Sequence, residues 1–501
     1  MKKFVNIFII SSFILLSMNL VSCVQSQDHI IHFDCLQTDK VIHYLSEINC
    51  GPLPNHDNHD GVDLTKQYQE VGIDFIRTHD FNGPTDVSSI FPDFSLDPFL
   101  ESSYNFSISD RYISGIINAG CKVFYRLGES ASIEEQLRQP PSNFTKWAEI
   151  CKHIIMHYND GWADGHHYNI KYFEIWNEPD LMGFFNGTAG QYYELYRTTA
   201  EKLKEYNPSL KIGGPCTSSI NNVNYTTGFL KYVLEHNTPL DFYSWHMYAD
   251  TPFQIYEASK NVRNLLDNFG LKYTESINTE WNINIGFPQR DKNNAKNAAF
   301  TTSTLTLLQD TGIDYAFRYR GTGDNNLLAR FIGFDLSLFS YDGTYKTPSL
   351  SYKIMNIMEK KTPKRIQTEK IGGLSGITYL GGISEDQSNI SILISNYEAG
   401  DQEYQIILDN IPWNNSYTIV HYVIDDSSHF EIKEEYKMNS SSIELSETIK
   451  SSTVHFFWLT NTSLIPDEGP ETLKIPILMQ LKILDPIRFI FAMAFMMIFF
   501  D

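Results

Sequence analysis

Short apolar runs rich in β-branched and aromatic residues alternate along this chain with longer stretches in which apolar residues recur every three or four positions. The first pattern is typical of buried β-strands and the second of amphipathic helices. Two clear helical stretches are 147–159 and 191–207. Eight runs are strand candidates: 41–48, 72–80, 121–129, 170–179, 210–215, 240–248, 273–282 and 315–321.

The regular repetition of a strand followed by a helix predicts parallel strands, because each helix returns the chain to the same edge of a sheet. Eight such units, spaced by roughly 30 to 50 residues, predict an α/β fold in which the strands close into a (β/α)₈ TIM barrel. The barrel is expected to cover residues 40–360, with 347–360 as its closing helix.

A different pattern follows the barrel. Four short runs of alternating character, separated by polar turns, lie at 388–397, 403–410, 416–425 and 452–461. A period of two predicts strands with one buried face, so we expect a C-terminal antiparallel β-sandwich domain over 362–462. The apolar segment 28–36 is a candidate further strand of this sandwich.

The N-terminus has the pattern of a secretory signal peptide over residues 1–23, with two lysines, an apolar stretch and small residues before Cys23. Eight Asn-x-Ser/Thr sequons favour a eukaryotic secretory route to the outside, the cell surface or the lysosome over bacterial lipoprotein processing at Cys23. The sequon asparagines are Asn105, Asn143, Asn186, Asn224, Asn389, Asn414, Asn439 and Asn461.

The C-terminal tail, 463–501, ends in an apolar stretch from residue 487 onwards. Its length is short for a membrane span and suits the hydrophobic end of a GPI-anchor signal, which would tether the chain to a membrane through a lipid. A terminal helix is the alternative interpretation.

Charge and cysteine content narrow the function classes. The chain carries 39 basic and 60 acidic side chains, a net charge of −21, which argues against nucleic acid or an anionic membrane surface as the main partner. The five cysteines after Cys23 contain no C-x-x-C pair, so neither a zinc site nor a disulfide framework is predicted, and Cys35–Cys50 is the one candidate bridge. The His- and Asp-rich segment 55–61 is interpreted as a turn. No metal and no cofactor are predicted.

Polar residues gather at the C-terminal ends of the strand candidates. In a TIM barrel these ends meet at one face, where active sites lie. We therefore expect one site formed by residues from several strands: His79, Asp80, Glu129, Asn177, Glu178, His246, Tyr248, Glu280, Arg318 and Arg320.

Glu178 and Glu280 are the central pair of this expected site. A lone carboxylate after an aromatic strand is costly to bury unless a function compensates it. Two facing carboxyl groups provide the chemistry of glycoside hydrolysis, in which one protonates the leaving oxygen and the other attacks the anomeric carbon or activates water. A desolvated carboxyl beside another negative charge keeps its proton near neutral pH, as the acid of such a pair must.

The segments "EIWNEPDL" (174–181) and "INTEWN" (277–282) resemble clan A of the glycoside hydrolases, and most closely family 39, which contains β-xylosidases and α-L-iduronidases. "IRTHD", "YRLGE" and "FYSWHMY" extend the resemblance over roughly 40–360. It implies Glu178 as general acid/base and Glu280 as nucleophile of a retaining enzyme, with Asn177 on the sugar 2-hydroxyl. The expected substrate-binding set is Asn177, His79, His246, Tyr248, Trp281 and Arg320.

The last barrel strand departs from the xylosidase pattern. It reads "FRYRGTGDNN" (317–326) instead of an aromatic-rich segment. Strand alternation predicts that Arg318 and Arg320 point to the same side, where they would either bind a sugar carboxylate or neutralise Glu280 or Glu129. Three hypotheses follow: a β-xylosidase-like hydrolase acting on a glycoside or oligosaccharide, a uronide hydrolase of the α-L-iduronidase type, and a catalytically silent carbohydrate-binding protein.

Overall fold

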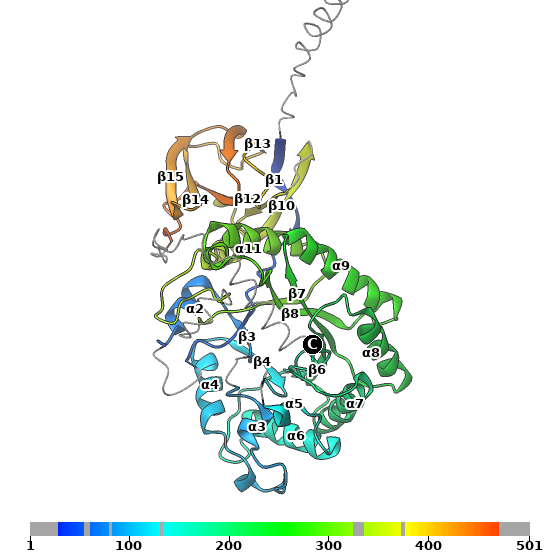
Figure 1. Ribbon diagram of the computed structural model, residues 1–501. Coiled ribbons are helices and arrows are strands. Elements are labelled where there is room, and N and C mark those ends of the chain that lie inside the picture. The colour runs from blue at the N-terminus through cyan, green and yellow to red at the C-terminus, as the bar shows by residue number, and fades with distance from the viewer. Residues whose placement is uncertain are drawn as a thin grey trace, which may run out of the picture.

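The computed structural model describes residues 29–54, 61–79, 83–130, 132, 134–323, 335–371 and 376–469. The expected signal peptide, Asp80, the segment 55–60 and the apolar C-terminal end lie outside the described residues. The chain forms a barrel surrounded by helices, with a β-sheet domain packed on one side of it (Figure 1). Among the described helices, none combines the length and the apolar character needed to cross a membrane.

The barrel is closed by eight strands that are hydrogen-bonded in chain order. All neighbouring strands are parallel, and Ile48 of the first strand pairs with Arg318 of the last to close the ring. This confirms the predicted TIM barrel. The strands are β2 (Ile48–Asn49), β3 (Phe75–Arg77), β4 (Lys122–Leu127), β5 (Tyr172–Ile175), β6 (Lys211–Thr217), β7 (Phe242–Ala249), β8 (Glu275–Ile283) and β9 (Tyr315–Arg318).

Helices cover the outside of the barrel (Figure 1). Several begin at side-chain caps, such as Thr188, which forms a capping box with Gln191. The helices are α2 (Thr65–Val71), α3 (Val87–Ile90), α4 (Ser107–Asn118), α5 (Glu135–Arg138), α6 (Phe144–Asp160), α7 (Ala189–Tyr206), α8 (Val223–Glu235), α9 (Pro252–Asn268), α10 (Gln289–Asn293), α11 (Ala295–Leu308) and α13 (Ser349–Lys361), with a 3₁₀ turn at Glu101–Ser103.

The first barrel strand is shorter than the pattern predicts. The apolar segment 41–48 was expected to form it, but the strand is only Ile48–Asn49. The preceding residues connect the barrel to the outer sheet, and Ile42 and Leu45 are buried along this connection. The apolar pattern therefore belongs to a buried connection between the barrel and the sheet, and not to a barrel strand.

Side chains fill the barrel interior in layers, as alternation along the strands requires. The lower layer is apolar and contains Phe75, Phe124, Phe242, Ile277 and Phe317. Two positions further along β3, β4 and β5 the buried residues are Arg77, Arg126 and Glu174. A charged layer therefore separates the apolar floor from the C-terminal ends of the strands.

A nine-stranded sheet forms the second domain, in the order β15-β14-β17-β12-β11-β10-β1-β13-β16. Ile31, Ile392 and Ile419 come from separate parts of this order but belong to one buried cluster, so the sheet folds over on itself as a sandwich. The predicted sandwich is confirmed. Its strands are β1 (His29–Val41), β10 (Lys364–Ile371), β11 (Ile377–Ile383), β12 (Asn389–Asn396), β13 (Gln402–Asp409), β14 (Tyr417–Ile424), β15 (His429–Met438), β16 (Ile443–Ile449) and β17 (Thr453–Thr460).

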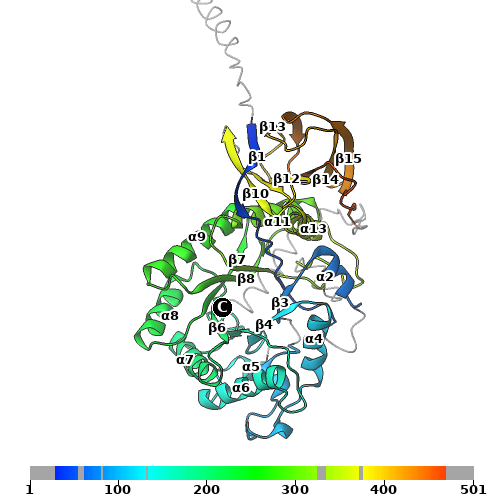
Figure 2. The same cartoon turned by 180° about the vertical axis from the view of Figure 1, so that it is seen from behind.

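Strand β1 precedes the barrel in the chain but pairs with strands that follow it. It lies between β10, to which it is antiparallel, and β13, to which it is parallel (Figure 2). The β1–β13 pair is the exception to the expected antiparallel arrangement. A parallel neighbour needs a long connection, and here the whole barrel provides it.

Helix α11 lies between the barrel and the sheet (Figure 1). Nearly all of its residues are buried, as expected for a helix with protein on both sides. On the sheet side, Ser303 donates to Ser395 Oγ at 3.0 Å, and Ser395 donates to the Ala299 carbonyl at 3.1 Å. Small hydroxyl side chains thus hold the domains at close range.

None of the five described cysteines forms a disulfide bond, and all five are buried. Cys35 lies in the sandwich core, whereas the Cys50 thiol donates to the His79 carbonyl at the barrel. The candidate Cys35–Cys50 bridge is therefore not formed.

Candidate active site

Glu178 and Glu280 meet at the C-terminal end of the barrel. Glu178 follows β5, and Glu280 lies within β8. One carboxylate oxygen of each and one ring nitrogen of His246 all lie within 4.8 Å of one another. The two glutamates of the expected pair are thus brought together, with a histidine between them.

Glu178 is positioned by its backbone and by one described side-chain contact, with His246. Its φ of 41° lies in the left-handed region, a conformation that costs about 1–3 kcal/mol for a non-glycine residue and that neighbouring contacts must enforce. Its N–H donates to the Cys216 carbonyl at 3.1 Å. Its Oε1 lies 2.8 Å from His246 Nδ1. Burial, together with the nearby charge of Asp180, raises the pKa of Glu178 to about 8.

Glu280 has a richer set of donors. Arg77 Nη1 donates to Oε1 at 3.0 Å, and the Tyr248 hydroxyl donates to Oε2 at 2.8 Å. His79 Nε2 lies 3.3 Å from Oε1. Burial, with the nearby Glu178, raises the pKa of Glu280, whereas His246, Arg77 and the Tyr248 hydrogen bond limit this rise. Glu280 is therefore the better stabilised carboxylate of the pair.

Both histidines beside the glutamates favour the neutral form. Burial lowers the pKa of His246, and burial together with the Arg77 charge lowers that of His79 well below its usual range. The ring contact between His246 and Glu178 then requires a proton on one of the two partners. A neutral His246 places no full positive charge beside Glu178, in keeping with the raised pKa of this carboxyl group.

Arg77 contacts three residues beneath the two glutamates or at their level. Its guanidinium donates to Glu174 at 2.7 Å, to Asn177 Oδ1 at 2.6 Å and to Glu280 at 3.0 Å. The side chain is fully buried, and although burial alone would lower its pKa, Glu174 and Glu280 raise it above the usual value. The planar fork suits such multiple contacts, which a lysine could not make.

Asn177 is oriented by this arginine. Its carbonyl oxygen accepts from Arg77, while its Nδ2 is buried and has no hydrogen-bond partner among the described residues. A buried unsatisfied amide is costly. The amide can therefore donate to an acceptor from a ligand at this position.

The two carboxyl groups have different surroundings. The pKa of Glu178 is raised to about 8, whereas Glu280 accepts hydrogen bonds from donors that stabilise its ionised form. One oxygen of each carboxyl group lies within 4.8 Å of an oxygen of the other, so both groups can act on the same bound molecule.

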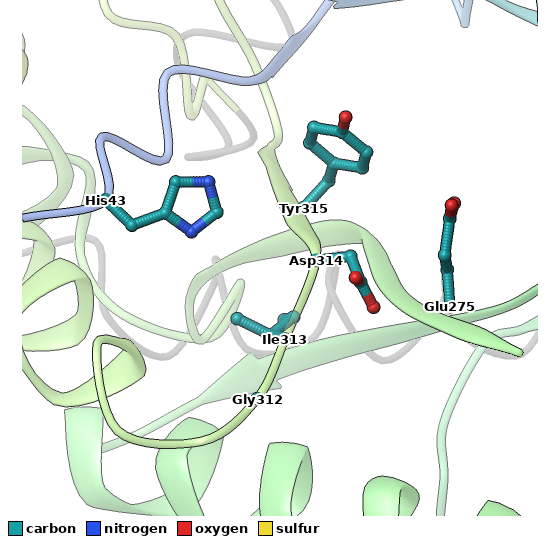
Figure 3. A pocket seen from close by; sticks show the side chains of 6 residues that line it. All are labelled: His43, Glu275, Gly312, Ile313, Asp314 and Tyr315. Atoms are coloured by element: carbon teal, nitrogen blue, oxygen red, sulfur yellow. The ribbon is translucent and has the colours of Figure 1, made fainter. Parts of the chain in front are cut away.

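A separate pocket of about 420 Å³ lies at the opposite end of the barrel (Figure 3). Its walls include the first residues of β8 and β9, and the active-site face is at the other ends of these strands. This end of a TIM barrel usually serves stability. The lining residues are His43, Glu275, Gly312, Ile313, Asp314 and Tyr315.

Comparison with known proteins identifies the family. Residues 38–399 match the sequence profile of glycosyl hydrolases family 39. The chain belongs to glycosyl hydrolases family 39. The resemblance inferred from the motifs around the two glutamates is thereby confirmed.

Two curated relatives in this comparison are β-xylosidases. That of Geobacillus stearothermophilus is 25% identical over 288 residues, which cover 49% of this chain and 55% of the relative. That of Caldicellulosiruptor saccharolyticus is 28% identical over 204 residues, covering 37% of this chain and 38% of the relative. The chain thus spans about half the length, or less, of the curated relatives it matches.

Solved structures share the fold over most of the chain. A glucosidase from Croceicoccus marinus has a TM-score of 0.75 at 24% identity, covering 87% of this chain and 100% of its own. A monomeric β-xylosidase from Caulobacter crescentus has a TM-score of 0.67 at 15% identity, covering 86% of this chain and 99% of its own. The family 39 chain therefore has the barrel-and-sandwich architecture of these proteins.

Two of the expected site residues point elsewhere. Trp281 was expected to contact substrate, but it is fully buried in the core between strands and helices, and its indole donates to the Ala316 carbonyl at 2.9 Å. Arg318 donates to the Leu336 carbonyl at 3.1 Å. Alternation explains both, because their strand neighbours Glu280 and Phe317 face the barrel interior.

Arg320 and Glu129 follow the C-terminal ends of barrel strands, and their described contacts include Tyr319 and Ser88. β9 ends at Arg318, so the alternation expected to align the two arginines does not extend to Arg320. Arg320 lies over the Tyr319 ring, with Cζ 5.8 Å from its centroid, and its charge acts on His79. Glu129 accepts from the Ser88 N–H at 3.0 Å, and burial, reinforced by Asp86, raises its pKa to about 8.

Sequence reasoning missed Arg77 and Glu174. Each lies in a barrel strand directly after an apolar residue, Ile76 before Arg77 and Phe173 before Glu174. A charged residue inside a core strand requires a buried partner. That signal could have marked both residues as one ion pair beneath the site of this family 39 chain.

Proposed function

We propose that this chain is a retaining glycoside hydrolase of the β-xylosidase type, with Glu178 as general acid/base and Glu280 as nucleophile. The observation that carries the proposal is the approach of the two carboxyl groups to within 4.8 Å in unequal environments. Arg77 and Tyr248 stabilise Glu280 as an anion, while the raised pKa of Glu178 keeps its proton available.

The reaction proceeds in two displacements. In the first, a Glu280 oxygen bonds to the anomeric carbon while the glycosidic C–O bond breaks, and Glu178 gives its proton to the departing oxygen. In the second, Glu178 removes a proton from water, whose oxygen bonds to the anomeric carbon as the bond to Glu280 breaks. Glu178 then holds its proton again, and the sugar leaves with its original anomeric configuration.

Asn177 and His79 are assigned to sugar binding. The unpaired Nδ2 of Asn177 supports a hydrogen bond to the 2-hydroxyl next to the reacting carbon. His79 Nδ1 is likewise buried without a partner among the described residues. Such hydrogen bonds become stronger as charge develops at the anomeric carbon. They therefore stabilise the transition state more than the bound substrate.

The choice of a β-xyloside rests on the two β-xylosidase relatives. A panel of chromogenic xylosides, arabinosides, glucosides and iduronides tests it, with the anomer of the first-formed sugar followed by proton NMR. Fastest turnover of the β-xyloside with retention supports the proposal. Inversion contradicts it, and a panel without any hydrolysis favours a silent carbohydrate-binding protein instead.

A uronide substrate is the second candidate, because Arg320 lies close enough to act on His79 at the site. If Arg320 binds a sugar carboxylate, Arg320→Lys will impair a uronide far more than its neutral counterpart, since lysine keeps the charge but loses the bidentate fork. Equal effects on both sugars exclude a carboxylate clamp. The buried Arg318 is the matched control, because its guanidinium contacts Leu336 and Asn282 instead.

We also propose that the chain enters the secretory pathway, with or without a lipid tether at its C-terminus. Six sequon asparagines are exposed, Asn186 is half-buried, and Asn389 is buried in β12. Expression in a eukaryotic secretory host, followed by glycopeptide mass spectrometry, should find glycans at exposed sequons and none at Asn389. An unmodified chain retained in the cytosol would contradict this proposal. The exposed sequon asparagines are Asn105, Asn143, Asn224, Asn414, Asn439 and Asn461.

A further inference from the structure

A second cluster of metal-ligating side chains lies outside the barrel, away from the two glutamates. It consists of Asp110 on α4, His157 near the end of α6 and His166 in the loop between α6 and β5. One potential ligand atom from each lies within 4.8 Å of the others. The loop enters β5 at its N-terminal end, whereas Glu178 follows the other end of this strand. The cluster is therefore separate from the catalytic residues.

The hydrogen-bond partners of His157 indicate a proton or a cation between its ring and Asp110. Its Nδ1 lies 2.9 Å from the Trp162 carbonyl oxygen, which only accepts hydrogen bonds, so Nδ1 carries a proton. In the neutral ring Nε2 then presents a lone pair, yet it lies 2.8 Å from Asp110 Oδ1. Two acceptors at this distance require either a second proton or a cation between them.

His166 provides a third ligand atom for such a cation. Its Nε2 lies 3.5 Å from the same Asp110 oxygen. Ligand atoms around a tetrahedral zinc ion, with bonds of about 2.0–2.1 Å, lie about 3.3 Å apart. The two separations from Asp110 lie on either side of this value, so small side-chain movements can bring all three ligands to one ion.

The loop that carries His166 is fixed against α6. The His166 N–H donates to the His157 carbonyl at 2.6 Å, and the Gly161 N–H donates to the His166 carbonyl at 3.0 Å. At Gly165 a Cβ atom would lie 2.7 Å from His157 Nδ1 and 2.1 Å from its carbonyl oxygen. Glycine is thus required where the loop approaches the imidazole, and the two histidines are held together before any ion binds.

The surroundings of the rings add to this preorganisation. Phe106 stacks on His157 with centroids 3.5 Å apart, and Tyr168 stacks on His166 with centroids 4.5 Å apart. The buried Tyr158 hydroxyl also lies close to Asp110. The backbone carbonyl that accepts from His157 Nδ1 is the usual outer partner of a metal-bound histidine.

We propose that Asp110, His157 and His166 form a binding site for a divalent transition-metal cation, with Zn²⁺ as the best match. Two imidazoles and one carboxylate are the ligand types that zinc prefers. His166 and Asp110 are partly exposed, which leaves one coordination position open to water. The ion ties α4 to the end of α6 and to the α6–β5 loop, and its role is structural.

Titration of the chelator-treated chain with Zn²⁺ alone, followed by calorimetry, tests this site. We expect one ion per chain and a loss of affinity of at least about tenfold in His166→Ala, since changes in even the outer partners of a metal ligand cost this much. His167→Ala is the matched control, because His167 is the adjacent, exposed histidine of the same loop. Asp110→Asn is the second ligand variant and keeps the side-chain shape.

Thermal unfolding provides an independent measurement. An ion that binds the native state raises the Tm, so Zn²⁺ should raise the Tm of the unmodified chain and of His167→Ala, but not that of His166→Ala or Asp110→Asn. Absence of Zn²⁺ binding overturns the proposal and leaves Asp110 and His157 as an ion pair. Binding that persists in His166→Ala but disappears in Glu280→Gln also overturns it, because the ion would then lie at the catalytic pair.

Discussion

Glu178 and Glu280 lie within 4.8 Å of each other, yet the donors around them differ. Glu280 receives hydrogen bonds from Arg77 and Tyr248, whereas the described side-chain contact of Glu178 is His246. Two carboxyl groups this close cannot both ionise easily. The donors therefore decide which of them holds the proton, and this division of labour underlies the predictions below.

Replacing Glu178 by Ala should harm substrates according to their leaving group. Glycosides with a poor leaving group need its proton and should lose roughly 10²–10⁴-fold in kcat, the usual contribution of general acid catalysis. Aryl glycosides with an acidic phenol need no protonation in the first step and should lose much less in the rate of glycosyl-enzyme formation. Stopped-flow release of the phenol measures that rate. Equal losses on both substrate types would contradict the assignment of Glu178.

The pH dependence of kcat/KM should show a basic limb set by Glu178. The acid must be protonated to act, and its pKa is about 8, so activity should fall as the pH rises through this value. Asp180→Asn removes a negative charge that helps to keep the proton on Glu178, so its basic limb should move to lower pH.

Ser218→Ala is the control for this experiment. It removes a hydrogen bond to Asp180, in which the Ser218 hydroxyl donates at 2.9 Å, but it leaves the charge in place. Its basic limb should stay where it is in the unmodified chain. A limb that moves in Ser218→Ala but not in Asp180→Asn would show that packing, and not charge, controls Glu178.

Tyr248→Phe should weaken the anionic form of Glu280. The hydroxyl donates to Oε2 at 2.8 Å, and a hydrogen bond to a charged group contributes about 1.5–3 kcal/mol, equivalent to a loss of roughly 10- to 100-fold in kcat/KM. Because the pKa of Glu280 rises when this donor is lost, the acidic limb of the pH profile should move to higher pH. An acidic limb that does not move would show that Tyr248 has no effect on the ionisation of Glu280.

Arg77→Ala should destabilise the fold as well as the site. It leaves Glu174 buried without its partner, and breaking a buried pair in this way costs about 3–5 kcal/mol. Urea denaturation measures the loss. The exposed Lys66–Glu70 pair provides the comparison, because Lys66→Ala should cost at most about 1 kcal/mol. The double variant Arg77→Ala/Glu174→Ala should lose less than the sum of the two single variants, and strict additivity would contradict a direct ion pair.

The sequence predicts the fold because its strands carry period-two and continuous apolar patterns that helices do not share. The exception is the first barrel strand. β2 contributes only Ile48 and Asn49 to the barrel, and two residues have no periodicity to detect. The apolar residues before them are buried along the connection to the sheet, which a local pattern does not distinguish from a strand.

The site was predictable where function places a polar residue in an apolar run, as at Glu178. Neighbours in sequence are a poorer guide, since Trp281 follows Glu280 but faces the opposite side of β8. Contacts between separate strands, such as Arg77 with Glu174, become visible only when the barrel closes. The same holds for Asp110 and His166, which lie far apart in the chain and meet at the end of α6.

The most direct test of the account is to identify the residue that forms a bond with the sugar. A 2-deoxy-2-fluoro-xyloside with a good leaving group should accumulate as a glycosyl-enzyme, because the fluorine slows both displacements and the leaving group compensates only the first. Mass spectrometry of the digested protein should find the added sugar on the peptide that contains Glu280, and Glu280→Gln should remain unlabelled. A label on Glu178, or on neither glutamate during turnover, would contradict the proposed mechanism.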